Sequence, residues 1–311
     1  MRIGSHVSIA GSLAKAPGNA AKVGAEVFQI FSRSPHGGPV KPITPELIQE
    51  FSAKVGAEVF QIFSRSPHGG PVKPITPELI QEFSQEMKKH KLDTFYIHTP
   101  YFINFSSIKS NIYYGSISVV REELERGSLI GCRAVMTHLG SFGELTDKEG
   151  LERVAKAISK IMEGYEGSTQ LLLEISAGAG RIVGDTFEEV AAILENKLVA
   201  KYNVGVCFDT CHAFASGYDL RTKKDVETTL KQFDKVIGLE KLIMIHANDS
   251  MAELGKHLDR HQHIGKGHIG LEGFKALVNH KTLGKLDWIL ETPKDDPKDD
   301  PKNIAVLKKL K

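Results

Sequence analysis

The chain has 311 residues, of which 41% are hydrophobic and 25% are charged, and its formal net charge is +2. This composition excludes a disordered chain, and the small net charge confines any nucleic-acid surface to a local patch. No apolar run approaches the roughly 18 residues of a membrane span, and the odd number of cysteines argues against a disulfide framework. We therefore expect a cytoplasmic protein that does not contact a membrane.

A tandem repeat lies near the N-terminus. Residues 21–52, AKVGAEVFQIFSRSPHGGPVKPITPELIQEFS, recur letter for letter as residues 53–84, with a period of 32 residues. A solenoid would need about three or more such units, so two copies indicate a single duplication of one strand and helix unit. We expect one copy to supply a strand to the fold and the other to be an insertion outside it.

Short apolar or β-branched runs alternate with amphipathic segments along the chain. Eight strands are predicted when the duplicated run is counted once: Arg2–Val7, Val27–Phe31, Thr94–His98, Ala134–His138, Gln170–Ile175, Val204–Asp209, Leu242–His246 and Asp287–Glu291. Between the strands lie segments with apolar residues at helical spacing, such as Leu151–Met162 and Thr186–Leu194. This alternation predicts an α/β protein, a (β/α)₈ barrel in one domain over residues 1–311. An open doubly wound sheet is less favoured, because no Gly-rich phosphate fingerprint follows the first strand.

Six consecutive predicted strands end in a histidine or a carboxylate. These residues are His98, His138, Glu174, Asp209, His246 and Glu291. Barrel enzymes build their active sites at the carboxyl ends of the strands, so we expect these side chains to converge. Several buried charges in one place are costly unless cations neutralise them, and the pattern therefore predicts a metal centre.

Three further candidate ligands follow the sixth and seventh strands. His212 lies three residues after Asp209, and Asp259 and His261 lie two apart in a Gly-bordered loop. Nine candidates exceed the four ligands of one zinc ion and suit three ions that share carboxylates. Histidine and carboxylate ligands without thiolate fit zinc, with manganese or iron as substitutes. Cys207 and Cys211 are interpreted as small buried residues rather than ligands.

Several segments resemble the signature blocks of the endonuclease IV family of zinc-dependent apurinic/apyrimidinic endonucleases. They are IGSHVSIAGSL, VCFDTCHAFASGYDLRT, MIHANDS, HLDRHQHIGKGHIG and WILETP, and the resemblance covers the chain apart from one copy of the repeat. It implies a first zinc site of His98, His138 and Glu174. It implies a second of Glu174, Asp209, His246 and Glu291, with Glu174 as the bridging ligand, and a third of His212, Asp259 and His261.

The resemblance also implies a DNA-repair activity. The substrate would be double-stranded DNA, cut 5′ to an abasic site to leave a 3′-hydroxyl, with Glu174 as the catalytic residue that orients the attacking hydroxide. Tyr101 resembles a family tyrosine at the lesion, with ordinary packing at the rim as the alternative. Lys266, Arg33 and its twin Arg65 are candidates for phosphate contact.

Two other functions are consistent with the same residues. A sugar isomerase or epimerase of the xylose isomerase type also gathers His, Asp and Glu around one or two divalent ions, but it has no need of the third set. A catalytically impaired DNA-binding barrel is the other, if the duplication disturbs the strand ends. A monomer is expected, because the DNA-binding face must stay clear.

Overall fold

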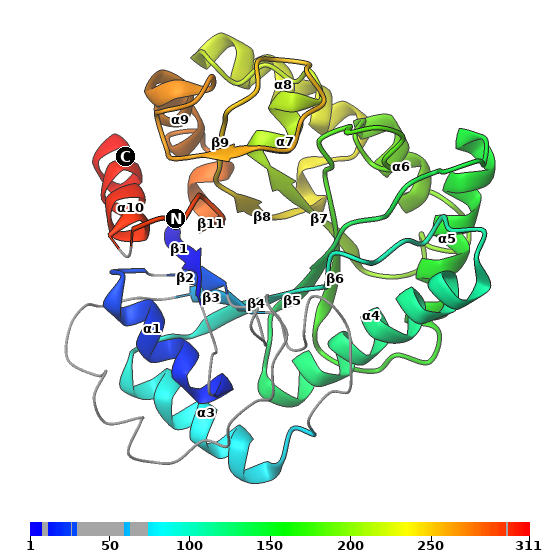
Figure 1. The fold of residues 1–311 in the computed structure, drawn as a ribbon, viewed down its shortest axis with the longest axis horizontal. Coiled ribbons are helices and arrows are strands. Elements are labelled where there is room, and N and C mark those ends of the chain that lie inside the picture. The colour runs from blue at the N-terminus through cyan, green and yellow to red at the C-terminus, as the bar shows by residue number, and fades with distance from the viewer. Residues whose placement is uncertain (8–11, 26, 30–58, 63–73, 297) are drawn as a thin grey trace.

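The computed structural model describes residues 1–7, 12–25, 27–29, 59–62, 74–296 and 298–311 as a ring of parallel strands surrounded by helices (Figure 1). The strands are β1 (Arg2–His6), β2 (Val27–Gln29), β3 (Val59–Ile62), β4 (Thr94–His98), β5 (Ala134–Thr137), β6 (Gln170–Glu174), β7 (Val204–Asp209), β8 (Leu242–His246), β9 (Asp249–Ser250), β10 (His261–Gln262) and β11 (Asp287–Leu290). The α-helices are α1 (Ala16–Lys22), α3 (Pro77–Lys89), α4 (Ser110–Ile130), α5 (Asp147–Met162), α6 (Phe187–Leu194), α7 (Thr210–Ala215), α8 (Lys223–Val236), α9 (Gly270–Val278) and α10 (Asp299–Leu310). Short 3₁₀ helices are η1 (Leu13–Lys15), η2 (Leu239–Lys241) and η3 (Leu283–Lys285).

The main sheet closes on itself. Parallel pairing runs from β3 through β4, β5, β6, β7 and β8 to β11, and β11 pairs with β1 from Arg2–Asp287 to Ser5–Leu290. A single pair, His6 with Gln61, joins β1 to β3. The predicted α/β barrel is therefore confirmed, and β4, β7 and β8 have the bounds that the sequence predicted.

Both copies of the repeat contribute a strand, which differs from the expectation that one copy lies outside the sheet. β2, from the first copy, pairs with Gly4, Ser5 and His6 of β1. β3, from the second copy, pairs with β4 along its whole length. The sheet consequently has nine strands among the described residues. The physical reason is that identical copies have identical strand propensity, and the same edge of β1 accepts hydrogen bonds from either.

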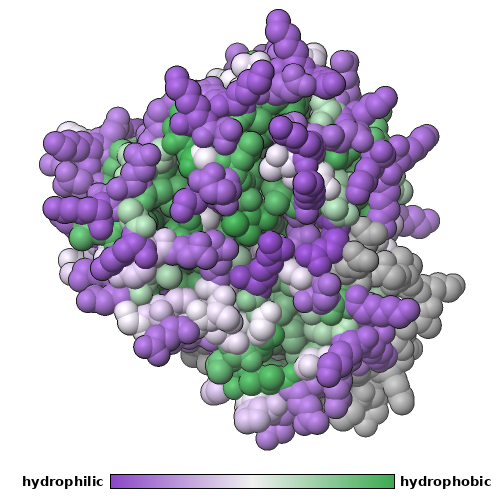
Figure 2. Space-filling model, turned by 180° about the vertical axis from the view of Figure 1, so that it is seen from behind, coloured by the Kyte–Doolittle hydropathy of each residue, from purple (hydrophilic) through white to green (hydrophobic). Residues whose placement is uncertain are grey.

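Side chains from the strands form two separate cores. Alternate strand residues fill the inside of the ring: Tyr96, Ala134, Met136, Leu172, Cys207, Met244 and Ile289. The residues between them, such as Phe95 and Trp288, pack outward against the helices in the larger core. On the face opposite the view of Figure 1, hydrophilic side chains cover most of the surface and apolar surface is recessed between them (Figure 2).

A buried carboxylate links strands on different sides of the ring at the end opposite the predicted ligands. Asp287 accepts hydrogen bonds from Arg2 Nε at 2.7 Å, Tyr96 Oη at 2.8 Å and Arg133 Nη1 at 3.1 Å. Its side chain is almost fully buried, so these donors compensate its charge. Asp287 therefore helps to hold β1, β4 and β11 in register.

Four helices begin after a threonine that caps their first turn. The hydroxyl oxygens of Thr76, Thr146, Thr186 and Thr222 accept from the backbone N–H three residues later. Such caps satisfy N–H groups that have no partner inside the helix, so they define where α3, α5, α6 and α8 start. No helix in the described ranges combines the length and apolar character that a bilayer crossing requires.

Removal of one repeat copy is expected to preserve the barrel. Deleting residues 53–84 gives the same sequence as deleting 21–52, because the copies are identical. The remaining strand would then lie between β1 and β4. Removing the second copy should change the entropy of loop closure only slightly, because that entropy varies slowly with loop length. We expect the deletion variant to melt at the same temperature or higher by circular dichroism and to bind the same amount of zinc. Loss of cooperative unfolding would show that both copies are structural.

Candidate metal centre

Strand alternation places the predicted ligands on one face. Each of six strands carries a residue of the inner core, and the predicted ligand lies two positions later: Tyr96 and His98, Met136 and His138, Leu172 and Glu174, Cys207 and Asp209, Met244 and His246, Ile289 and Glu291. Residues two apart in a strand point the same way. The six side chains therefore continue the inner core toward the carboxyl end of the ring.

Glu174 lies at the centre of this group and is fully buried. Its Oε2 is 3.0 Å from His98 Nε2 and 3.6 Å from His138 Nε2. Its Oε1 is 2.8 Å from His246 Nδ1, and the same nitrogen is 3.5 Å from Glu291 Oε2. One carboxylate thus reaches ligands from three other strand ends, as a bridging ligand must.

The remaining three predicted ligands form a second cluster beside the first. His212 Nε2 and His261 Nε2 are 3.3 Å apart, and Asp259 Oδ1 lies 3.3 Å and 3.4 Å from them, respectively. His212 Nδ1 is 3.6 Å from Glu174 Oε1, and His261 Nε2 is 3.7 Å from Asp209 Oδ2. The two clusters are therefore contiguous.

Three groups of potential ligand atoms coincide with the predicted sets. Within each of them, all the atoms lie within 4.8 Å of one another: His98, His138 and Glu174; Glu174, Asp209, His246 and Glu291; His212, Asp259 and His261. Two further groups include Cys207 or Cys211. Burial raises the pKa of Cys207 to about 12, so this thiol is neutral, and both cysteines are buried as expected. Nitrogen and carboxylate donors at this spacing fit a divalent cation such as zinc.

Electrostatic coupling keeps the carboxylates ionised. Burial raises the pKa of Glu174, but the charges of His138 and His246 and the hydrogen bonds from His246 and His98 outweigh it and hold the pKa well below its ordinary value. Burial lowers the pKa of His212, yet Asp209 and Asp259 raise it well above the ordinary value. The carboxylates are therefore ionised at neutral pH, and a bound cation would take the place of the proton that they hold on His212.

Asp209 and Asn248 show how the local fold orients the ligands. Asp209 caps α7, because its Oδ1 accepts from the backbone N–H of His212 at 2.9 Å. Asn248 Nδ2 donates to Asp209 Oδ2 at 2.8 Å, and Asn248 Oδ1 accepts from Glu291 N at 2.8 Å. Sequence reasoning did not single out Asn248, although its position two residues after His246 places it at the same strand end.

A pocket of about 420 Å³ opens above the clusters. It is lined by His6, His98, Tyr101, His138, His212, Asp259, His261, Glu291, Thr292 and Lys294. Tyr101 lines this pocket and is 59% exposed, so its side chain is accessible at the pocket's mouth. His6 and Lys294 had no role in the sequence analysis. Lys294 Nζ donates to Ser5 Oγ at 2.9 Å and to Asp300 Oδ2 at 2.8 Å, which ties the segment after β11 to β1.

The candidate phosphate-binding residues divide into two kinds. Arg33 and Arg65 lie outside the described residues. Lys266 is exposed on the loop after β10. The backbone N–H groups beside it do not face a ligand, because those of Gly265 and Gly267 donate to Asp249 Oδ2 at 2.9 Å and 3.0 Å. A contact of this loop with phosphate would therefore come from a side chain such as that of Lys266 rather than from these two amides.

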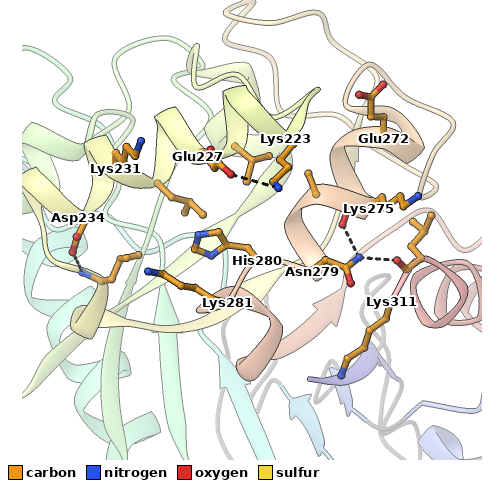
Figure 3. Close-up of a pocket in the computed structure, with 15 residues that line it drawn as sticks. Lys223, Glu227, Lys231, Asp234, Glu272, Lys275, Asn279, His280, Lys281 and Lys311 are labelled. Carbon is orange, nitrogen blue, oxygen red and sulfur yellow. Dashed lines mark hydrogen bonds and ion pairs between the residues drawn. The ribbon is translucent and has the colours of Figure 1, made fainter.

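A larger groove of about 980 Å³ lies away from the metal ligands, between α8, α9 and the C-terminus. Figure 3 shows the His280 imidazole near its middle and the lysine side chains pointing in different directions. None of the potential metal-binding groups in the described part of the chain includes a residue of this groove. The candidate metal ligands are therefore found at the smaller pocket.

Comparisons with known proteins agree with this arrangement. A family model described as a Xylose isomerase-like TIM barrel matches residues 49–310. A curated relative from Methanoculleus marisnigri, named Probable endonuclease 4, is 39% identical over 309 residues, which cover 99% of this chain and 98% of the relative. The crystal structure of endonuclease IV from Thermus thermophilus superposes with a TM-score of 0.79 at 29% identity, over 100% of this chain and 98% of that one.

A more distant neighbour shares the fold alone. A D-allulose 3-epimerase from Methylomonas sp. superposes with a TM-score of 0.63 at 12% identity, over 100% of this chain and 98% of that one. The fold and the ligand clusters thus define a metal-site barrel of the xylose isomerase-like class. Within that class, the chain belongs to the endonuclease IV family.

The first turn of α6 carries a titratable group that should make stability depend on pH. Burial raises the pKa of Glu189 from its ordinary 4.5 to about 7, although its Oε2 accepts from Gly184 N at 2.7 Å. The native state then holds a proton that the unfolded state releases, so the free energy of unfolding should fall as pH rises from about 4.5 to about 7. Urea unfolding across this range should show a shallower fall in Glu189→Gln. Glu188, the exposed neighbouring residue, provides a control. If the unfolding free energy depended on pH equally in Glu189→Gln and Glu188→Gln, the raised pKa would not belong to Glu189.

Proposed function

We propose that the chain is a DNA-repair endonuclease that hydrolyses the phosphodiester bond 5′ to abasic sites in double-stranded DNA and leaves a 3′-hydroxyl. Three zinc ions would serve the reaction. His98, His138 and Glu174 would hold the first, and Glu174, Asp209, His246 and Glu291 the second. His212, Asp259 and His261 would hold the third.

The observation that carries this proposal is the third cluster. A two-ion sugar isomerase has no use for His212, Asp259 and His261, yet their nitrogen and oxygen atoms lie within 4.8 Å of one another beside the Glu174 clusters. Membership of the endonuclease IV family supports nuclease activity and a DNA substrate. Likeness to an epimerase at 12% identity supports the shared barrel only.

Divalent ions in such a site supply Lewis acidity: they make water acidic near neutral pH and neutralise charge on the scissile phosphate. The chain's own residues provide the geometry. Glu174 presents both carboxylate oxygens to the centre, and Asn248 holds Asp209 by a hydrogen bond. Tyr101 lines the pocket together with the candidate ligands His98, His138 and Glu291, where it can contact the sugar at the lesion. Lys266, Arg33 and Arg65 are proposed as phosphate contacts.

Substitution of the bridging carboxylate tests the mechanism. Glu174→Gln removes the negative charge shared by two ligand sets, and we expect incision of an abasic-site duplex to fall by roughly 100-fold or more. Gel-based incision with zinc-loaded protein measures this, and circular dichroism verifies that the variant is folded. Retention of more than about a tenth of the wild-type rate would remove Glu174 from the proposed role.

Substitution in the third cluster separates a nuclease from a sugar isomerase. We expect His261→Ala to bind one zinc equivalent fewer than the wild type and to lose most incision activity, because His261 and Asp259 converge with His212. Zinc content by mass spectrometry and incision are measured together. His263→Ala provides a neighbouring control outside the three sets. Full zinc content and full activity in His261→Ala would favour the isomerase function.

A further inference from the structure

Asp249 is a fully buried carboxylate that none of the proposed metal sets includes. It accepts five backbone hydrogen bonds, from Ser250 and Ile269 to Oδ1 at 2.8 Å and 2.9 Å and from Gly265, Gly267 and Gly270 to Oδ2 at 2.9 Å, 3.0 Å and 3.2 Å. Converging N–H groups of this kind compensate a buried negative charge. The aspartate is therefore the centre around which residues 265–270 are folded.

The segment that returns to Asp249 carries two of the proposed third-set ligands. It leaves at β9 and comes back at β10, where His261 pairs with Ser250 and Gln262 pairs with Asp249. Met251 N donates to Arg260 O at 2.9 Å, and His268 N donates to Ser250 O at 2.8 Å. Residues 251–268 are thus held on both sides of Asp259 and His261 by contacts within one or two residues of Asp249.

This arrangement requires a side chain with two acceptor oxygens. An asparagine offers one acceptor oxygen. Its NH₂ group would face backbone N–H groups from which it cannot accept a hydrogen bond. Buried N–H groups left without a partner favour rearrangement of the loop. His212, on α7, is held separately by the carbonyl of Ile175 at 2.9 Å from its Nδ1. A change at Asp249 should therefore displace Asp259 and His261 while His212 stays in place.

We infer that Asp249 is a positioning residue for the divalent cation held by His212, Asp259 and His261, an inference that rests on the proposed function. Asp249 does not contact the cation or the DNA. It acts through the backbone of residues 251–270, by keeping Asp259 and His261 at the distance from His212 that one cation requires.

Zinc titration of Asp249→Asn tests this inference. We expect one zinc equivalent to bind about 10- to 100-fold more weakly than in the wild type, with the other equivalents unchanged. Raising free zinc should restore that equivalent and, with it, kcat for abasic-site DNA, which a general loss of folding would not allow. Cobalt substitution gives a second measure, because the visible absorption of one site should be lost at low cobalt concentration. Wild-type affinity for every equivalent in a folded Asp249→Asn protein would overturn the inference.

A second variant disturbs the same contact from the opposite side. A methyl group at Gly267 would collide with the Ser250 carbonyl oxygen and with Asp249, whereas one at exposed Gly115 of α4 would meet nothing within 4 Å. We expect Gly267→Ala to weaken the same zinc equivalent and Gly115→Ala to leave it unchanged. If Asp249→Asn does not fold, this pair still decides the question. Equal zinc titrations in the pair would count against the inference.

Asp287→Asn separates positioning from general destabilisation. Asp287 is also buried and accepts several hydrogen bonds, but it lies at the other end of the barrel. We expect a lower melting temperature with a wild-type zinc titration. Selective loss of the same zinc equivalent in this variant would overturn the inference. Incision by the wild type is measured separately, so failure of the proposed function is distinguishable from failure at Asp249.

Discussion

The buried charge of Glu174 is the constraint on which the rest of the site depends. A carboxylate with no exposed surface is stable in its ionised form only where positive or hydrogen-bonding groups surround it. His98 and His246, from β4 and β8, approach its two oxygens at 3.0 Å and 2.8 Å. These strands are not neighbours in the sheet, so the contacts require a closed ring. The curvature that closes the barrel therefore also brings the metal ligands together.

The ligands differ in how firmly the fold holds them. Those at strand ends continue the alternation of the inner core, and Glu174, Asp209 and His246 are each paired with a neighbouring strand. Asp259 and His261 lie instead on a segment that leaves the barrel and returns, and buried Asp249 provides the anchor that a strand would otherwise provide. This division explains how one barrel class can support different chemistry, because loops vary while strand ends remain.

A shared fold and a sequence similarity over the whole chain carry different weight for function. Epimerases of the same class have the same barrel, so the fold by itself does not distinguish a sugar substrate from DNA. The full-length likeness to endonuclease IV relatives and the third ligand cluster both point to the nuclease. The larger groove between α8 and α9 lacks such a cluster among the described residues, so the larger cavity is not the one that the candidate metal ligands line.

The sequence by itself determined the barrel class, the bounds of β4, β7 and β8 and the candidate ligands at the strand ends, because period-two alternation places Met136 and His138, or Leu172 and Glu174, on one face. It could not determine that Glu174 reaches both His98 and His246, since that distance depends on ring closure between residues far apart in the chain. It also could not show that Asp249 occupies the amides of Gly265 and Gly267, which a sequence pattern leaves available to phosphate. Nor could it choose between the repeat copies: both carry the same residues, and only tertiary pairing places β2 on β1 and β3 on β4.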